Sequence, residues 1–398
     1  MSLAVPTSSE FPTLAREGLV YLDTAATSQT VRPAIEEMDR YYETYRASIH
    51  RGIYEIASEA TDAYEAARDT VARFVGSTPG ETIFTKNVTE AINLVSYSWG
   101  RANVGPDDLV LITQMEHHSN IVPWQLLGCR LAYVPVTDEG LLDLDVLDSL
   151  LAQGPKLVAV AHVSNVLGTI NPIAEIVERA HAAGALVIVD GAQAVPSMPV
   201  DVSELGADFY AWTGHKAYGP TGIGVLHGRR SLLEAMPPFL GGGHMIARVG
   251  DFESTWAEPP ARFEAGTMPI AESIGLRAAV DWLSGVGMAA VREHGRDVTA
   301  YALERLSEVE GLTYHGTSDV DARGALVSFE LEGIHPHDVA EILGRDGVCV
   351  RAGHHCAQPL MRRLGAPAST RASIAVHTTR EDIDALVAGL AKVQEVFA

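Results

Sequence analysis

Five short apolar runs between positions 108 and 214 constrain the fold more than any other feature of the sequence. They are rich in Val and Ile and continuous rather than alternating: DLVLIT (108–113), RLAYVPV (130–136), KLVAVAHV (156–163), ALVIVD (185–190) and DFYAWTG (208–214). Such runs are typical of strands that are buried on both faces of a mostly parallel sheet. Amphipathic segments such as PIAEIVERAHAAG (172–184) separate them and end at a glycine. The alternation predicts a doubly wound α/β domain.

The C-terminal part of the chain has a different pattern. After RFEAGTMP (262–269), longer helical periods replace the alternation, and one strand-like run, GALVSFEL (324–331), follows them. A chain of 398 residues is longer than one hydrophobic core usually supports. We therefore expect a large domain over residues 20–280 and a smaller α+β domain formed by residues 1–19 and 281–398.

Composition argues against several classes of protein. The formal net charge of −22 at pH 7 would repel phosphate backbones, so we expect no nucleic-acid partner. No segment approaches the roughly 20 apolar residues that cross a bilayer, and the first residues lack the basic and apolar pattern of a secretion signal. We expect a soluble, cytoplasmic protein with no membrane partner.

The chain has three cysteines, and their spacing does not suggest disulfides. Cys129, Cys349 and Cys356 lie too far apart for a paired framework, which indicates a reducing compartment. Cys349 lies between two valines of a predicted strand, so we expect it in the core. Cys129 has no partner nearby and is also expected to be structural.

Polar residues follow the predicted strands. In an open parallel sheet the ligand crevice lies beyond the carboxyl ends of the strands, so these residues are the first site candidates. They are His117, Asn165, Asp190, Thr213, His215 and Lys216. Asp190 closes a wholly apolar strand, where a carboxylate is costly to bury unless a cation meets it. The alternative role of Asp190 is to cap the following turn.

Lys216 is one of only four lysines in the chain, and it lies in TGHKAYGPTGIG (213–224). An amine can lose its proton and form a Schiff base, which a guanidinium cannot do. The alternatives are a surface lysine or a nucleotide-binding oxidoreductase, but neither G-x-G-x-x-G nor a P-loop is present. A strand-end aspartate, a Schiff-base lysine and hydroxyl donors for a phosphate describe a pyridoxal phosphate site better.

Cys356 lies in RAGHHCAQPL (351–360), beside two histidines and near Arg351. Zinc is the alternative interpretation, but adjacent side chains point in different directions and there is no second ligand cluster, so we predict no metal site. A cationic, hydrogen-bonding setting favours the thiolate form of a cysteine. The sequence therefore makes Cys356 a candidate nucleophile.

An ordered set of motifs gives a more specific expectation. The motifs are SNVLGT (164–169), DGAQAV (190–195), TGHKAYGPTGIG (213–224), RFEAGT (262–267) and RAGHHCAQPLM (351–361). With them, from YLDTAAT (21–27) to the C-terminal helices, the chain resembles the group II, SufS-like cysteine desulfurases of the class V aminotransferase family. The resemblance implies a pyridoxal 5'-phosphate (PLP)-dependent transferase of fold type I. It also implies conversion of L-cysteine to L-alanine, with the sulfur held as a persulfide on Cys356 for iron–sulfur cluster assembly.

The resemblance also implies roles for individual residues around the cofactor ring. Lys216 matches the lysine that forms a Schiff base with PLP and later shuttles protons. Asp190 matches the carboxylate that keeps the pyridine nitrogen protonated. Gln193 would bond the phenolic oxygen, and His117 would stack on the ring and assist as an acid or base.

Phosphate and substrate ligands follow from the same comparison. Those implied for the phosphate are Thr89, Thr213, His215 and, from the neighbouring subunit of a homodimer, Thr267. Those implied for the substrate carboxylate are Arg371 in STRASIAV (369–376), Asn165 and Arg351. The chain departs from its relatives at NVTEAIN (87–93), where Asn87 and Val88 replace a Gly-Thr pair. We expect phosphate binding with one side-chain donor fewer.

The last motif concerns a partner protein. In GIHPHDVAEIL (333–343), His335 and His337 flank a proline at a predicted helix start, a pattern that also fits a solvent-facing capped turn. The resemblance favours a small zinc-bearing sulfur acceptor of the SufU kind, with a SufE-like acceptor as the alternative, and it implies that His337 enters the zinc site of that partner. Selenocysteine lyase activity remains the alternative function, because the same motifs serve both elements.

Overall fold

The large sheet contains the five apolar runs of the sequence. The computed structural model describes residues 8–397. In the order in which they lie side by side, the strands are β2 (Thr82–Thr85), β8 (Gly224–Gly228), β7 (Phe209–Thr213), β6 (Leu186–Asp190), β5 (Leu157–Ala161), β3 (Leu109–Thr113) and β4 (Arg130–Val134). Neighbouring strands from β4 to β7 pair in parallel, whereas β8 and β2 pair antiparallel. The prediction of a doubly wound, mostly parallel sheet is confirmed.

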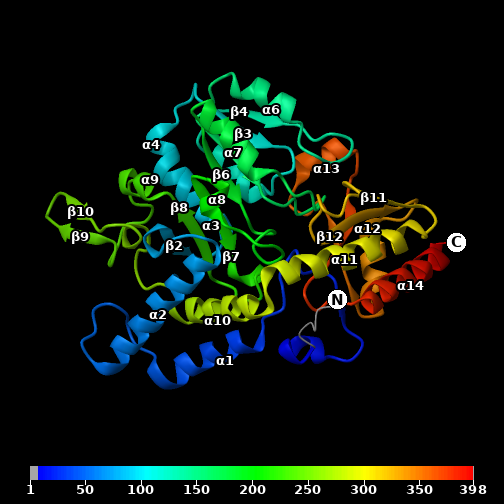
Figure 1. The fold of residues 1–398 in the computed structure, drawn as a ribbon, viewed down its shortest axis with the longest axis horizontal. Helices are drawn as coiled ribbons and strands as arrows, with labels where there is room; N and C mark the ends of the chain where they lie inside the picture. The colour runs from blue at the N-terminus through cyan, green and yellow to red at the C-terminus, as the bar shows by residue number, and fades with distance from the viewer. Residues whose placement is uncertain (1–7, 398) are drawn as a thin grey trace.

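Helices cover both faces of this sheet (Figure 1). Val187 and Val189 of β6 belong to the apolar cluster that includes α7 (Ile173–Ala182), whereas Ile188 belongs to the cluster of α3 (Val88–Val95). Successive strand residues point to opposite faces, so a strand that is covered on both faces must be apolar throughout. The other helices of this part are α1 (Arg32–Arg40), α2 (Glu55–Phe74), α4 (Arg101–Asn103), α5 (Val122–Gln125), α6 (Leu144–Leu151), α8 (Val202–Leu205), α9 (Arg230–Ala235) and α10 (Ile270–Val286).

A second, antiparallel sheet is formed by the C-terminal part of the chain. Its strands, in spatial order, are β11 (Leu312–Tyr314), β12 (Leu326–Leu331), β15 (Ser369–Ser373) and β14 (Arg351–Gly353). It shares a third apolar cluster with α11 (Met288–Ser307), α12 (Pro336–Arg345) and α14 (Arg380–Phe397). Near this sheet are α13 (Gln358–Leu364) and the parallel pair of β1 (Val20–Tyr21) and β13 (Val348–Cys349). The strand predicted over 324–331 is therefore β12.

The chain bends sharply between α10 and α11. Gly287 separates them with φ of 89°, a left-handed value that glycine adopts readily. α10 packs against α1 and α2, whereas α11 packs against α14. Among residues 8–397, no single helix is long and apolar enough to span a membrane, and the α10–α11 pair meets that test only by combined length and composition, with a bend of 74°. The domain boundary near residue 280 stays a prediction.

Residues 22–28, which we call the crossing segment, run from the small sheet to the end of β7. The N–H of Ser373 donates to Leu22 O (2.7 Å), and the N–H of Ala25 donates to Ser373 Oγ (2.9 Å). At the other end, the N–H of Ser28 donates to His215 O (2.9 Å). The crossing segment therefore ties the two sheets together beside the carboxyl end of β7.

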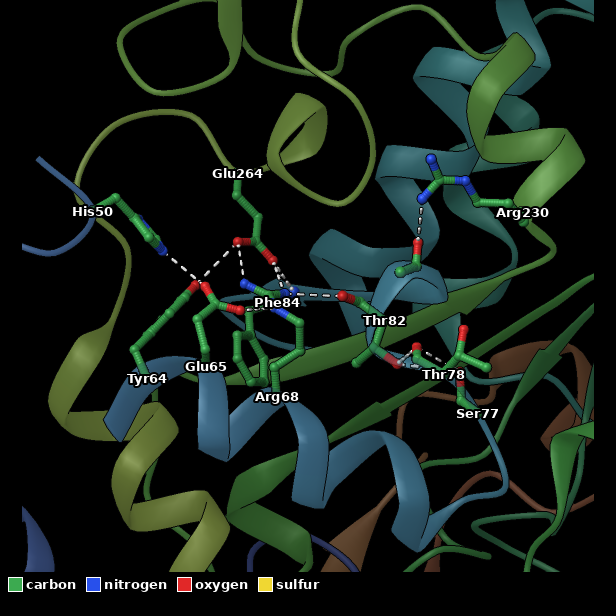
Figure 2. Close-up of polar contacts among 11 residues, drawn as sticks. His50, Tyr64, Glu65, Arg68, Ser77, Thr78, Thr82, Phe84, Arg230 and Glu264 are labelled. Atoms are coloured by element: carbon green, nitrogen blue, oxygen red, sulfur yellow. Dashed lines mark hydrogen bonds and ion pairs between the residues drawn. The ribbon is translucent and has the colours of Figure 1, made fainter. Parts of the chain in front are cut away.

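A buried ion pair fixes the segment that leads into α10 (Figure 2). Arg68 on α2 donates from both terminal nitrogens to Glu264, at 2.7 and 2.8 Å. Tyr64 Oη and the N–H of Phe84 also donate to the Glu264 carboxylate, at 3.1 and 2.8 Å. Glu264 is 1% exposed, so its charge depends entirely on these partners. We call these groups the Glu264 cluster; it joins α2, β2 and the RFEAGT segment.

The β9–β10 hairpin, of Ile246–Val249 and Ser254–Trp256, lies at the edge of the molecule on the side of the large sheet (Figure 1). The side chains of Val249, Phe252 and Trp256 are exposed on it. Apolar side chains that are gathered on one exposed hairpin are candidates for a contact with another chain.

Candidate active site

Lys216 lies in the turn that directly follows β7, where a parallel sheet presents its ligand crevice. Its ammonium group interacts with the charges of Asp190, Arg351 and Arg371 and with Cys356. The fold thus brings together five candidate residues that the sequence scatters between positions 190 and 371. Within residues 8–397, Lys216 Nζ makes no hydrogen bond.

The environment of Lys216 favours the neutral amine. Its pKa is lowered to about 8, chiefly by burial and also by Arg371 and Arg351, while Asp190 acts in the opposite direction. Only the unprotonated amine is a nucleophile, so a lowered pKa makes this lysine competent to form a Schiff base near neutral pH.

Asp190 ends β6, the strand next to β7, and is 6% exposed. Burial raises the pKa of its carboxyl group, while a hydrogen bond from the N–H of Ala192 (3.0 Å) and the charge of Lys216 lower it. The carboxylate therefore depends on a cationic neighbour inside the crevice.

His117 follows β3 and is held in one orientation. The N–H of Ser119 donates to His117 Nδ1 (3.1 Å), so the neutral ring carries its proton on Nε2. Burial, and then Lys216 and other nearby cations, lower the pKa of His117 to about 3. At pH 7 the ring is an uncharged, flat surface with one free N–H donor.

Glu116, the residue before His117, holds this turn in place. It is fully buried and accepts hydrogen bonds from Thr113 Oγ1 (2.6 Å), Asn120 Nδ2 (2.6 Å) and the N–H of Ala161 (2.8 Å). Burial raises the pKa of its carboxyl to about 8, partly offset by these bonds. Glu116 thereby links the ends of β3 and β5 next to His117 in the sequence.

Cys356 lies on a strained turn after β14. His355 and Cys356 have φ of 51° and 57°, a left-handed conformation that costs a non-glycine residue about 1 kcal/mol or more. The N–H of His118 donates to Cys356 O and Asn165 Nδ2 donates to His355 O, both at 2.7 Å. The turn is held by residues of the large sheet, and the thiol stays partly exposed at the crevice.

The two histidines before Cys356 point in different directions. His355 is buried, and its Nε2 lies 3.0 Å from Ser369 Oγ, whereas His354 is exposed. Burial and then the charge of Arg371 lower the pKa of His355 to about 3, so the ring is neutral. The positive charges that act on Cys356 therefore include those of Lys216 and Arg371 but not that of His355.

Arg371 and Arg351 face each other across β15 and β14, where they are paired in register. Arg371 is 2% exposed; its Nη1 donates to Asn165 O (2.9 Å) and its Nη2 to Asp23 Oδ1 (3.4 Å). Its Nε is buried and has no hydrogen-bond partner. Burial lowers the pKa of Arg371 to about 10, with a further contribution from Arg351 and an opposing one from Asp23. This pair can bind a carboxylate.

The start of α3 lies close to the end of β7. Gly224 pairs with Thr85 on one side and with Thr213 on the other, and a Cβ at Gly224 would lie 2.5 Å from the backbone of Asn87. The Asn87 side chain caps α3 by accepting a hydrogen bond from the N–H of Glu90 (2.9 Å). Thr89 is exposed in the first turn. Free N–H groups at such a helix start suit a phosphate.

Gln193 and His215 contact the crossing segment. Gln193 Nε2 donates to Ala25 O (2.8 Å), and His215 Nδ1 lies 3.2 Å from Thr27 Oγ1. Burial and then Lys216 lower the pKa of His215 to about 4. Thr213 Oγ1 donates to Ile223 O (3.4 Å). Lys216, Gln193 and Ala25 line one pocket.

Thr267 is not part of this pocket. It lines a separate one with Ile49, His50, Arg51 and His244, in which the two histidine rings stack at 4.6 Å. His50 Nε2 lies 2.8 Å from Glu65 Oε1. Figure 2 shows His50 reaching Glu65 at the edge of the Glu264 cluster.

His337 lies apart from the crevice residues as well. It is exposed in the first turn of α12, where its N–H donates to Nδ1 of His335 (3.3 Å), the N-cap residue. The capped, solvent-facing turn that the sequence allowed is therefore present.

Comparison with known sequences assigns the family. The sequence model of the aminotransferase class-V family matches residues 20–386. The chain belongs to the class-V aminotransferase family. Within this family it is 50% identical to a probable cysteine desulfurase of Halalkalibacterium halodurans, over 97% of each chain. It is 47% identical to a cysteine desulfurase of Haloferax volcanii, over 96% of this chain and 90% of the other.

Solved structures of cysteine desulfurases agree with the fold. The apo cysteine desulfurase of Thermococcus onnurineus is 38% identical and superposes with a TM-score of 0.95, covering 99% of each chain. The cysteine desulfurase CsdA of Escherichia coli is 36% identical with a TM-score of 0.91, covering 98% of this chain and 97% of the other. Fold type I is therefore confirmed.

Class-V aminotransferases depend on PLP, and the residues of the crevice fit that group. Lys216 offers an amine of lowered pKa to an aldehyde, and Asp190 offers a buried carboxylate to a pyridinium. The neutral His117 ring offers a flat surface, and the start of α3 offers N–H groups for a phosphate. The donor set matches each functional group of the cofactor.

Sequence reasoning missed two residues of the crevice. Asp23 lies two residues after β1, and Asp190 is the last residue of β6, so the strand-end rule could have found Asp23, but β1 has only two residues. Glu116 directly precedes His117, and a carboxylate after an apolar run was the available signal.

Proposed function

We propose that this protein is a cysteine desulfurase that releases L-alanine from L-cysteine and keeps the sulfur on Cys356. The observation that carries the proposal is the position of the Cys356 thiol, on a strained turn beside Lys216 and Arg371. The Cys356 thiolate attacks the sulfur of the substrate. A sulfur–sulfur bond forms, the carbon–sulfur bond breaks, and a proton replaces sulfur on carbon to give alanine.

PLP bound at Lys216 would supply the electron sink that lets the carbon–sulfur bond break. Asp190 holds the ring nitrogen in its protonated form by charge. Lys216 carries the proton to the substrate carbon, for which a pKa of about 8 is well matched. The neutral His117 ring would offer the cofactor a flat surface that excludes water, and its Nε2–H as a hydrogen-bond donor.

Arg371 binds the substrate carboxylate, with Arg351 and Asn165 beside it. The support is the buried Nε of Arg371, an N–H donor that has no hydrogen-bond partner within residues 8–397 and could donate to a carboxylate oxygen. Thr89, Thr213 and His215 hold the phosphate together with the start of α3. The Asn87 side chain serves as the helix cap. Backbone N–H groups in the first turn of α3 donate to the phosphate in place of the missing side-chain donor.

We also propose that Thr267 completes the site of a second copy in a homodimer. The support is that Thr267 lines an outward pocket with His50, Arg51 and His244 rather than the pocket of Lys216. The exposed β9–β10 hairpin offers further apolar surface for such a contact.

The experiment that tests the activity uses purified protein with PLP and L-cysteine. We expect visible absorption that borohydride bleaches, attachment of the reduced cofactor to Lys216 in a peptide map, and equal amounts of alanine and transferable sulfur. A colourless protein that makes no alanine would exclude the proposal. Turnover of selenocysteine without turnover of cysteine would instead identify a selenocysteine lyase.

For the partner, we propose a small zinc-bearing acceptor of the SufU kind in the cytoplasm, where the sulfur enters iron–sulfur cluster assembly. The support is the exposed His337 imidazole at the start of α12, which is a suitable zinc ligand. His337→Ala should leave turnover without the acceptor unchanged and abolish stimulation by it. The matched control is His335→Asn, which keeps an N-cap acceptor. Equal stimulation of His337→Ala and wild type would show that His337 is only a turn residue.

A further inference from the structure

Lys216 lines a pocket at the seam between the two sheets, which we call the Lys216 pocket. Residues of the large sheet and the crossing segment form one part of its wall, and Leu326 and Ser373 of the small sheet form another. His117, Asp190 and Cys356 are not among its lining residues. The Lys216 pocket is therefore a space beside the groups that hold the substrate and the cofactor ring.

Polar groups of the Lys216 pocket have hydrogen-bonding capacity left. Within residues 8–397, Lys216 Nζ and Thr24 Oγ1 make no hydrogen bond, and neither atom is sealed from solvent. Tyr218 Oη accepts from the N–H of Val376 (3.2 Å), so its own proton is free to donate. Ser197 Oγ donates to Gln193 O (2.6 Å), so its lone pairs stay available.

The Lys216 pocket has the size and the polarity that water requires. Its volume is about 30 Å³. A buried water molecule needs about 10–15 Å³ and two to four polar partners, so the pocket can hold two. Pro196 and Ser197 line the pocket and are half-buried, and they form the side at which water can enter.

The proposed reaction requires the Lys216 amine to gain and lose protons within one turnover. A bound substrate occupies the crevice on the side of Arg371 and Cys356. The Lys216 pocket then provides the remaining contact between the amine and water. An amine that is hydrogen-bonded to water can exchange its protons with solvent.

We propose that the Lys216 pocket holds two water molecules that exchange protons with the Lys216 amine, and that Thr24 and Ser197 are positioning residues for this water. A proton passes from Nζ to a water oxygen, and another proton of that water returns to Nζ, so the exchange consumes nothing. The inference rests on the proposed function in one respect, the transfer of a proton by Lys216 to the substrate carbon.

The first measurement follows deuterium from the Cα of labelled L-cysteine into alanine, in ordinary water with the holoenzyme. In wild type, Lys216 should lose most of this deuterium to solvent. Thr24→Val keeps the shape of the side chain and removes a hydroxyl that has no partner within residues 8–397. We expect it to raise the fraction of deuterium retained in alanine at least about threefold, because the water loses one of roughly three partners.

The second measurement needs no cofactor. An amine reagent labels Lys216 in the full-length protein before PLP is added, and the pH dependence of labelling gives the pKa of the amine. The wild-type pKa should be about 8. Thr24→Val should lower it by about half a pH unit or more, because an ammonium group with less water beside it is more costly to bury. Ser197→Ala is a second variant, with the same direction expected in both measurements.

Two variants serve as controls. Thr24→Ser keeps the hydroxyl and should match wild type in both measurements. Thr313→Val makes the same exchange at an exposed position of β11 and should change neither. An unchanged labelling pKa in both Thr24→Val and Ser197→Ala, or the same drop in Thr313→Val, would overturn the proposal. A merely structural role of Thr24 would lower the melting temperature and leave both measurements unchanged.

The two measurements also separate failure of this inference from failure of the proposed function. If wild type releases alanine from cysteine and deuterium retention does not rise in the variants, the exchange through the Lys216 pocket is wrong. If wild type makes no alanine from cysteine, the proposed function is wrong. The labelling pKa then still decides whether water lies beside Lys216.

Discussion

Two regions of this molecule bury charged side chains. In one region the charged groups are fully hydrogen-bonded, and in the other a donor is left without a partner. In the Glu264 cluster the carboxylate accepts four hydrogen bonds, two of them from Arg68, and Arg68 also donates to Thr82 O (2.9 Å). In the crevice, Arg371 donates to Asn165 O (2.9 Å) and lies 3.4 Å from Asp23, but its Nε has no hydrogen-bond partner within residues 8–397.

The difference indicates that the charges of the Glu264 cluster stabilise the fold, whereas those of the crevice are available to a ligand. Breaking a fully paired buried ion pair is strongly destabilising, because one charge is then left without a partner. Donors that are left unpaired cost stability in the free protein and become favourable only when a ligand supplies the missing partner. The comparison leads to four predictions, from the largest effect to the smallest.

Lys216→Ala should reduce alanine formation by more than about 10³-fold, since no other group can supply the amine. Its thermal stability should change little, because Lys216 Nζ makes no hydrogen bond within residues 8–397 and the unfavourable burial of its ammonium group offsets its attraction to Asp190. The control is Lys156→Ala, which removes an exposed lysine 3.9 Å from Asp108. Turnover and bleaching by borohydride in Lys216→Ala would refute the assignment.

Cys356→Ser should lower persulfide and alanine formation from cysteine by about 10²-fold or more, because a hydroxyl is not ionised near neutral pH. The visible absorption of the cofactor should remain. Selenocysteine cleavage should persist, as the family resemblance implies. Cys129→Ser is the control, and mass spectrometry for the persulfide is the measurement. Unimpaired alanine release from cysteine would show that another group accepts the sulfur.

Glu264→Gln should lower the free energy of unfolding by about 3 kcal/mol, because Arg68 loses its buried counter-charge and keeps only the partly exposed Glu65. Glu65→Gln, on the same arginine but with 45% of its side chain exposed, should cost less than about 1 kcal/mol. Chemical denaturation measures both. Equal effects would mean that burial does not distinguish the two carboxylates.

The stability of the protein should fall as the pH drops below about 6.5. His117 has a folded pKa of about 3 and an ordinary value of 6.5, so the unfolded chain binds a proton that the folded protein refuses. Stability contributed by this group is complete above pH 6.5 and is lost toward pH 3. His117→Asn should reduce the slope by up to about 1.4 kcal/mol per pH unit. Denaturation between pH 4 and 7 measures it, and an unchanged slope would assign the dependence to other groups.

The sequence predicts the large sheet and the strand-end candidates well because both depend on local patterns. Apolar runs give the strands, and Asp190 and Lys216 follow from the rule for carboxyl ends. Asn87 shows a local signal that we interpreted incompletely: the loss of a phosphate donor was predicted, but the capping pattern of Asn87 with Glu90, three residues later, went unused.

The rest depends on contacts between distant segments. Arg351 and Arg371 become neighbours only through the register of β14 with β15, and Asp23 reaches Arg371 only through the crossing segment. The left-handed backbone at His355 and Cys356 is not a preference of these residues; it is imposed by bonds from His118 and Asn165. No local pattern encodes such pairings.

The crossing segment has a consequence for the order of biosynthesis. Ala25 leaves the ribosome early, yet its hydrogen-bond partner Ser373 follows 348 residues later. Domains usually fold as they emerge, from the N-terminus onward. Here the contact between the crossing segment and β15 can form only after residue 373 has been made. We therefore expect the cofactor to bind at the completed crevice only late in synthesis, after the last strand has been made.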